Sequence, residues 1–240
     1  MKKIKYLAIA AMCALSLSAN AQSFIVYGTD GSKTKYQAKN VKKIEFLEEE
    51  ESDDYNGHEY VDLGLSVKWA TMNIGASKPE DYGDYFAWGE TTTKTTYDWS
   101  TYTWCNGSES TMTKYCTVNN TTLELTDDAA HVNWGGSWRM PTKAEQDELR
   151  TKCTWTWTTQ GGMNGYKVTS KTNGNFIFLP AAGYRYDSSL YYAGSYGYFW
   201  SSSLSTSYSG SAYYLYFYSG DVDWDYGSRD FGRSVRAVCP

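Results

Sequence analysis

The sequence has few of the residues that hold transition metals. It contains two histidines, His58 and His131, and five cysteines among 240 residues. The spacing of the cysteines does not match a zinc site, so a Cys/His metal centre is not expected. After the N-terminal residues the chain also lacks any apolar run of about 18 residues, the length that a membrane-spanning helix needs. The sequence therefore predicts neither a cofactor nor a transmembrane segment.

Positive charge is scarce as well. The formal charge is −5, and loss of Lys2, Lys3 and Lys5 at the N-terminus would take it to −8. Six of these negative charges lie between Glu48 and Asp54, a run typical of a solvated linker. Because no basic patch balances them, nucleic acid is not an expected partner.

The first residues are typical of a secretory signal peptide. Three lysines precede an apolar run from Tyr6 to Leu17, and Ala19-Asn20-Ala21 supplies a small-residue cleavage site. We therefore expect residues 1–21 to be removed and the mature protein to be exported, to the extracellular space or the outer cell surface. A lipid anchor on Cys13 is the weaker alternative, because Met12 is larger than the residue expected before a lipidated cysteine.

Composition divides the rest of the chain into three parts. Residues 22–47 hold two short apolar runs, F-I-V-Y and V-K-K-I-E-F, which predict a β-element too short to own a core. We expect this element to pair with the main domain or with a partner such as a cell-surface or fimbrial assembly. Residues 48–56 form the acidic linker, and residues 57–240 form the main domain.

The main domain is predicted to be α+β, with two short helices packed on antiparallel sheets. A capping residue and two acids favour a helix from Thr126 to Val132. A T-x-x-E capping box at Thr142 predicts a second helix that ends near Lys152, with Ala144, Leu149 and Cys153 on one face. Strand patterns predominate after Cys153, at residues 155–159, 166–170, 176–180, 198–203, 212–225 and 234–239.

Export favours disulfides, and the four cysteines beyond the signal peptide allow three pairings. We favour a local bridge between Cys105 and Cys116 in the long loop from Thr91 to Thr122. The second predicted bridge joins Cys153, at the helix end, to Cys239 on the last strand. In the loop-entropy account such a long closed loop contributes about 4 kcal/mol to stability.

The main candidate for function is the stretch Ala212–Asp225, A-Y-Y-L-Y-F-Y-S-G-D-V-D-W-D. Side chains of a strand alternate between two faces, so a hairpin that turns at Ser219-Gly220 has one apolar face and one face of tyrosines and aspartates. From Phe176 onward the chain has no Asn, Lys, Gln, Glu, His or Met, and Tyr, Ser, Gly and Asp take their place. Tyrosine with Ser and Gly is the composition of antibody paratopes. The alternative is a tyrosine-rich β-domain whose aromatic side chains merely face water.

The candidate ligand-binding residues are the outward set of the hairpin, the residues after it and a tyrosine-rich segment before it. They are Tyr214, Tyr216, Tyr218, Asp221, Asp223, Asp225, Tyr226, Ser228, Asp230, Phe231, Tyr184, Tyr186, Tyr191, Tyr192 and Tyr196.

Several motifs resemble the Fibrobacter major paralogous domain family of exported bacterial proteins, whose fold is related to C-type lectins and to formylglycine-generating enzymes. They are Y-V-D-L-G-L-S-V-K-W-A-T-M-N-I-G from Tyr60, Y-G-D-Y-F-A-W-G-E from Tyr82, W-R-M-P-T-K-A-E from Trp138, F-W-S-S from Phe199 and G-R-S-V-R-A-V from Gly232. The resemblance covers residues 57–240 and implies a C-type-lectin-like fold. A bridge between Cys153 and Cys239 would match the long disulfide typical of that fold.

The segment 184–233 is similar to the variable region of proteins targeted by diversity-generating retroelements. In those systems adenines of Asn-rich codons are randomised, which yields Tyr, Asp, Ser, Gly and Phe but no stop codon. The candidate residues belong to that set and alternate with fixed-looking residues such as Leu215, Phe217 and Trp224. The resemblance implies an exported, non-enzymatic binding protein with an unknown surface protein or glycan as its ligand.

Two other functions follow from the same motifs. A calcium-dependent lectin would use Asp221, Asp223 and Asp225, but Tyr226 stands where the EF-hand loop requires Gly, and no E-P-N or Q-P-D tripeptide occurs. An oxidase like the formylglycine-generating enzymes would need a reactive cysteine pair. We favour the binding protein over both alternatives.

Overall fold

The computed structural model describes residues 23–27, 32–37, 54–116 and 121–240. The chain divides into two compact units, Met1–Glu51 and Ser52–Pro240. The division falls inside the predicted acidic linker. The predicted signal peptide, and residues 48–53 of the linker, lie outside the described residues.

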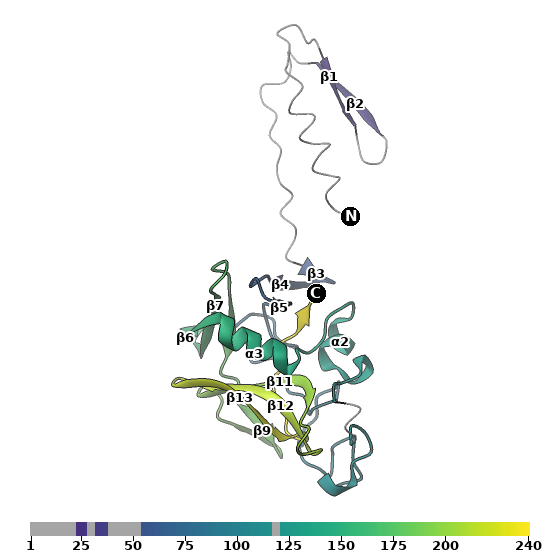
Figure 1. The fold of residues 1–240 in the computed structure, drawn as a ribbon, viewed down its shortest axis with the longest axis vertical. Coiled ribbons are helices and arrows are strands. Elements are labelled where there is room, and N and C mark those ends of the chain that lie inside the picture. The colour runs from purple at the N-terminus through teal and green to yellow at the C-terminus, as the bar shows by residue number, and fades with distance from the viewer. Residues whose placement is uncertain (1–22, 28–31, 38–53, 117–120) are drawn as a thin grey trace. The chain divides into compact units, whose positions relative to one another are not determined.

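The described part of the first unit is an antiparallel hairpin of β1 (Ser23–Tyr27) and β2 (Lys33–Gln37), drawn in purple in Figure 1. The first predicted apolar run forms β1, but its partner strand is K-T-K-Y-Q. The second predicted run, residues 41–46, lies outside the described residues. Every side chain of β2 is exposed, which agrees with a hairpin too small to form a core by itself.

The described residues of the second unit form four antiparallel sheets. One has the order β14-β5-β4-β3, with β3 at Asp54–Tyr55, β4 at His58–Val61, β5 at Lys68–Ala70 and β14 at Val238–Cys239. The next is β6 (Cys153–Gln160), β7 (Met163–Ser170) and β8 (Phe176–Pro180). The C-terminal sheet is β11 (Tyr196–Leu204), β12 (Ser211–Tyr218) and β13 (Asp221–Ser228). A small hairpin pairs β9 (Tyr184–Tyr186) with β10 (Ser189–Tyr191).

Two α-helices are present in the described residues, α2 (Ala129–Trp134) and α3 (Lys143–Lys152), with short 3-10 turns at Glu109–Thr111 and Leu125–Asp127. The capping box predicted for α3 is confirmed, because Thr142 and Glu145 cap each other. The predicted start of α2 is wrong: Asp128 caps it by accepting from the N–H groups of Ala130 and His131. The buried residues of α3 are Gln146 and Leu149, whereas Ala144 is exposed.

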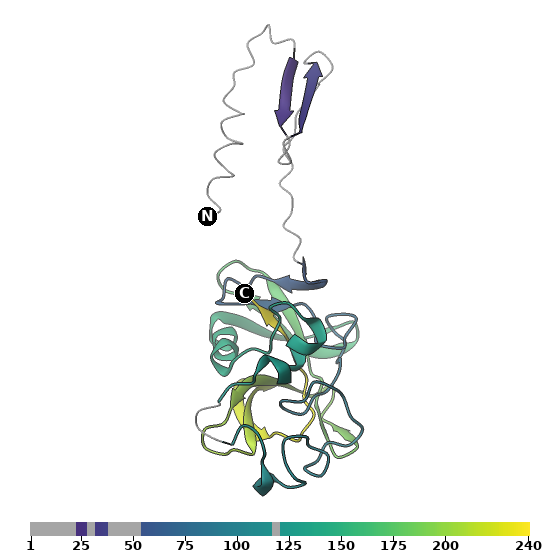
Figure 2. The ribbon, with the colours of Figure 1, turned by 90° about the vertical axis from the view of Figure 1, so that its right-hand side faces the viewer.

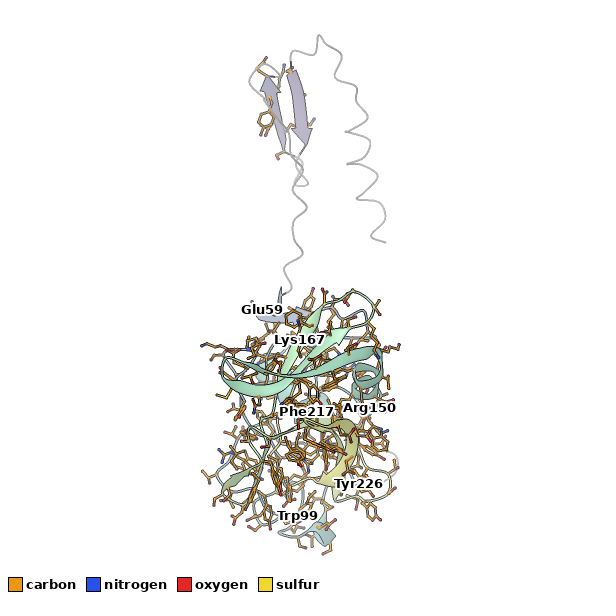
Figure 3. The ribbon with its side chains drawn as sticks, turned by 90° about the vertical axis from the view of Figure 1, so that its left-hand side faces the viewer. Glu59, Trp99, Arg150, Lys167, Phe217 and Tyr226 are labelled. Carbon is orange, nitrogen blue, oxygen red and sulfur yellow. The ribbon has the colours of Figure 1, made fainter. Side chains whose placement is uncertain are left out.

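One core cluster of the second unit lies where β6, β7 and α3 meet the C-terminal sheet, and a second gathers around Trp88, Trp138 and Trp200. Phe217 of β12 is fully buried, and its ring lies 5.3 Å from that of Tyr166 and 5.7 Å from that of Phe199. Figure 3 shows Phe217 in the interior of the unit, while Tyr226 and Trp99 lie toward its periphery. Side chains from strands far apart in the sequence therefore hold one side of the C-terminal sheet in place.

The predicted disulfides are wrong for this structure, in which all four cysteines are free thiols. Cys153 and Cys239 belong to different core clusters, and burial raises the pKa of both thiols, that of Cys153 to about 11. The Sγ of Cys105 lies 3.1 Å from the carbonyl oxygen of Trp99, and that of Cys116 lies 3.6 Å from the carbonyl oxygen of Met112. Each sulfur thus faces local partners rather than another sulfur.

A mixed fold with few helices and mostly antiparallel strands is confirmed, which is consistent with the predicted α+β class. Within the described ranges, none of the helices combines the length and the apolar composition needed to cross a bilayer.

Candidate functional site

The C-terminal sheet aligns aromatic and acidic side chains in columns on one of its faces. In the antiparallel register, Tyr218 pairs with Tyr196 on one side and Asp221 on the other, and Tyr216 pairs with Tyr198 and Asp223. Residues that pair directly across strands point to the same face. The next row continues this face with Trp200, Tyr214 and Asp225. The predicted alternation of the hairpin is thus confirmed.

The intervening residues of the same strands form the reverse face. Phe199, Leu215 and Phe217 on this face are buried in the core. Further along, the Nζ of Lys143 at the start of α3 lies 3.4 Å from the ring centroid of Trp224. Figure 1 shows α3 on one side of the sheet and β9 on the other. The helix therefore covers the reverse face and leaves the first face to the β9–β10 hairpin.

Rings from that hairpin and from the segment after β13 extend the first face. The ring of Tyr184 stacks on Phe231 at 5.4 Å and on Tyr191 at 5.6 Å, and it meets Tyr198 edge-on at 5.1 Å. Through Tyr198 the group is continuous with the sheet. We call the whole surface the aromatic-acidic face; its members are Tyr184, Tyr186, Tyr191, Tyr192, Tyr196, Tyr198, Tyr214, Tyr216, Tyr218, Asp221, Asp223, Asp225 and Phe231.

Exposure differs along this face. The most exposed rings are Tyr192 at 56%, Tyr186 at 44%, Tyr191 at 39% and Tyr218 at 37%. Tyr214, expected outside, is only 8% exposed because it belongs to a core cluster with Trp200. Burial raises the pKa of the Tyr214 phenol to about 12. The accessible part of the face is therefore the end that carries Tyr218 and the β9–β10 rings.

Three residues predicted to belong to this face lie elsewhere. Tyr226 is exposed, but it lies two residues after Trp224 and therefore on the reverse face of the sheet. Its ring stacks on that of Tyr208 at 5.5 Å. Ser228 lies on the same reverse face, and its hydroxyl donates a hydrogen bond to the carboxylate of Asp230. Asp230 is only 1% exposed, and burial raises the pKa of its carboxyl group. These three residues are removed from the candidate site.

A buried arginine lies beneath the aromatic-acidic face. The guanidinium of Arg233 is 3.7 Å from the ring centroid of Tyr214 and 4.1 Å from that of Trp200. Arg233 is 4% exposed, and its Nε and Nη1 have no hydrogen-bond partner among the described residues. Burial lowers its pKa to about 10. The positive charge of Arg233 is thus packed against the ring faces of Tyr214 and Trp200, beneath the less exposed end of the aromatic-acidic face.

Two other arginines of the last segment, Arg229 and Arg236, are also buried. Arg236 is buried and donates to the carbonyl oxygens of Ala70, Thr71 and Phe178 and to Asn73. Arg229 is buried too, and its Nε donates to the hydroxyl of Tyr102 at 2.8 Å. These two guanidinium groups are structural because they satisfy backbone and phenol oxygens far away in the sequence.

The aspartates of β13 also protect the edge of the sheet. Asp221, Asp223 and Asp225 each accept the N–H of the following residue, at 2.9, 2.8 and 2.8 Å respectively. In an antiparallel ladder the N–H groups of those following residues point away from β12. The carboxylates thus satisfy donors that an edge strand would otherwise leave open.

The three aspartates also make the aromatic-acidic face negatively charged. The Nε of Arg150 lies 3.8 Å from Asp223, and no other ion pair is formed by the three aspartates within the described residues. Burial, and then the charges of all three aspartates, raise the pKa of the Tyr216 phenol. The described residues contain no group of three or more His, Cys, Asp or Glu side chains that could hold a metal ion.

In a comparison with known protein families, residues 164–238 match a family described as a domain of unknown function, DUF8237. This range runs from β7 to β14 and includes the whole aromatic-acidic face. No curated protein and no solved structure matches the chain.

Tyr198 is the member of the face that the sequence analysis missed. It lies two residues after Tyr196 on β11 and faces the same side, so the alternation in Y-G-Y-F-W could have identified it. Four aromatic residues of the long loop pack together with Tyr85 and Cys105. They are Tyr97, Trp99, Tyr102 and Trp104.

Proposed function

We propose that this protein binds a surface protein or glycan through its aromatic-acidic face. The single observation that carries the proposal is the asymmetry of the C-terminal sheet: one face is anchored in the core, and the other presents connected tyrosine rings, several of them more than a third exposed. Connected aromatic side chains supply most of the energy at protein-binding surfaces. A contiguous exposed aromatic patch is also unusual on a protein without a partner.

We further propose that the second unit is an exported C-type-lectin-like domain and that residues 184–233 act as a variable region. The motifs from Tyr60 to Val238 support this by their order, and the alternation of Tyr and Asp with Leu215 and Phe217 supports it by position. A variable surface requires residues that change without loss of the core, and the exposed outward residues of β12 and β13, Tyr218, Asp221 and Asp225, meet that requirement. In this proposal the N-terminal hairpin attaches the protein to a cell-surface or fimbrial assembly.

The test is a binding screen of the full chain against an array of defined glycans and a displayed library of random peptides. We expect the triple variant Tyr186→Ala, Tyr192→Ala, Tyr218→Ala to bind the selected probes at least about tenfold more weakly, because exposed aromatic anchors are removed. Circular dichroism would check that the variant is folded.

The matched control replaces Phe176, Tyr208 and Tyr226 by Ala; these residues are 47%, 57% and 39% exposed and lie outside the face in the same unit. This control variant should keep the affinity of the unmodified protein. Equal affinity of the first triple variant, or equal losses in both, would show that the face is not the binding site.

A further inference from the structure

Both edges of the C-terminal sheet are occupied, which limits how a ligand can be held. On β13 the outward N–H groups of Val222, Trp224 and Tyr226 are bonded to the aspartates before them. On the other edge, residues of β11 form bridges with Thr122, Gly183 and Ser234. A ligand strand therefore gains few backbone hydrogen bonds here, and recognition must use the side chains of the face.

The rings of the face form a platform rather than a cage. A cation held between two parallel rings needs a gap of about 7 Å, twice the contact distance of carbon atoms. The stacked rings of Tyr184 and Phe231 are 5.4 Å apart, and those of Tyr184 and Tyr191 are 5.6 Å apart. A cationic group can thus lie over the outer ring faces, where guanidinium groups stack well, but not between the rings.

The carboxylates give the platform its preference for charge. Asp221 and Asp225 have no ion-pair partner within the described residues, and Asp223 has only Arg150 at 3.8 Å. An uncharged ligand that covered this row would remove carboxylates from water without compensation, which costs free energy. Ammonium or guanidinium groups of a ligand would compensate that cost.

The unpaired guanidinium of Arg233 adds a second requirement. Gly227 continues the aspartate column, and a Cβ atom there would lie 3.0 Å from the Nη2 of Arg233. The guanidinium is thus closest to the face at the one position of the column that has no side chain, where its Nη2 lies, while its Nε and Nη1 are buried without a partner among the described residues. A ligand that places an acceptor such as a peptide carbonyl over Gly227, next to its cations, would complement this positive charge.

We infer that the ligand of the aromatic-acidic face is a polypeptide segment bearing arginine or lysine side chains. This inference rests on the proposed function and names the chemical class of the ligand. Aspartates at alternate positions of β13 are about 7 Å apart, the spacing of basic residues at alternate positions of an extended peptide. Arginine is preferred over lysine because its planar group also stacks on tyrosine.

The test uses fluorescence anisotropy with the full chain and two labelled peptides of equal length, one of alternating Arg and Ser and one of alternating Glu and Ser. The Arg-Ser peptide should bind, increasingly weakly as salt is added, and the Glu-Ser peptide should not. The variant Asp221→Asn, Asp223→Asn, Asp225→Asn should bind the Arg-Ser peptide about tenfold more weakly, because three exposed charge pairs are lost. Asparagine keeps an acceptor oxygen for each edge N–H, so the sheet should remain folded.

The matched control is Glu59→Gln, Asp62→Asn, Glu109→Gln, which changes the same net charge at exposed positions outside the face. Binding by the control within about twofold of the unmodified protein supports the inference. Equal binding by the Asp221, Asp223, Asp225 variant overturns it. If the Arg-Ser peptide does not bind while a selected glycan or peptide still requires Tyr186, Tyr192 and Tyr218, the inference fails and the proposed function stands. If no probe requires those tyrosines, the proposed function fails as well.

Discussion

The two faces of the C-terminal sheet are made from alternate residues of the same three strands, yet they have different surroundings. On the reverse face, Phe217 contacts rings from β6, β7 and β11 and is fully buried. On the aromatic-acidic face, its neighbour Tyr218 is 37% exposed. Figure 2 shows these strands as a curved sheet in the second unit. One strand can therefore carry stability and recognition in adjacent positions.

The largest effect should come from the reverse face. Replacement of Phe217 by Ala should lower the free energy of unfolding by about 3–5 kcal/mol, because a fully buried ring leaves a cavity. Chemical denaturation of the variant measures this loss. Tyr218→Ala is the neighbouring control and should change the free energy by about 0.5 kcal/mol or less. Similar losses at both positions would contradict the distinction between the faces.

A smaller and more selective effect is expected from the buried arginines. Arg236→Met should cost about 3 kcal/mol, because it leaves the carbonyl oxygens of Ala70, Thr71 and Phe178 without their donor. Arg233→Met should change stability by only about 1 kcal/mol, since the unpaired guanidinium makes no hydrogen bond that methionine would remove. Parallel urea titrations compare the two variants. An equally large loss of stability in the Arg233 and Arg236 variants would mean that the ring contacts of Arg233 hold the aromatic-acidic face in place.

The smallest effect on stability should come from the exposed tyrosine rings of the aromatic-acidic face. The variant that removes Tyr186, Tyr192 and Tyr218 should unfold within about 1 kcal/mol of the unmodified protein, because surface substitutions away from the core cost little. Thermal unfolding followed by circular dichroism provides the measurement. A large loss would show that the stacked rings support the fold and would weaken the case for a variable region.

Local patterns predicted the elements well. The capping box at Thr142 and Glu145 predicts the start of α3, because both groups lie within one helical turn. The Ser219-Gly220 turn and the strict alternation around it predict the register of β12 and β13. The same alternation places Tyr226 on the reverse face with Trp224, so the prediction that Tyr226 belongs to the ligand-binding residues is inconsistent with the pattern itself. The capping of α2 by Asp128 rather than by Thr126 could not be predicted locally, since Asp128 also accepts hydrogen bonds from the distant N–H of Met140.

Pairings between distant residues were predicted poorly. The expected bridge between Cys153 and Cys239 assumed that the end of α3 and the last strand bring two sulfur atoms together, but these residues pack in separate core clusters. The burial of Arg229 and Arg236 does not follow from local sequence, because arginine is usually exposed. Loops from other parts of the chain supply the oxygens that make their burial possible.

The sequence by itself determined which residues of the C-terminal hairpin share a face, because side-chain alternation is a property of every extended strand. It did not determine how much of that face is accessible. Tyr214 is buried in a core cluster with Trp200, Asp230 is buried, and the guanidinium of Arg233 packs on the ring of Tyr214. Accessibility is set by which distant elements pack on a surface, and only the tertiary structure decides that.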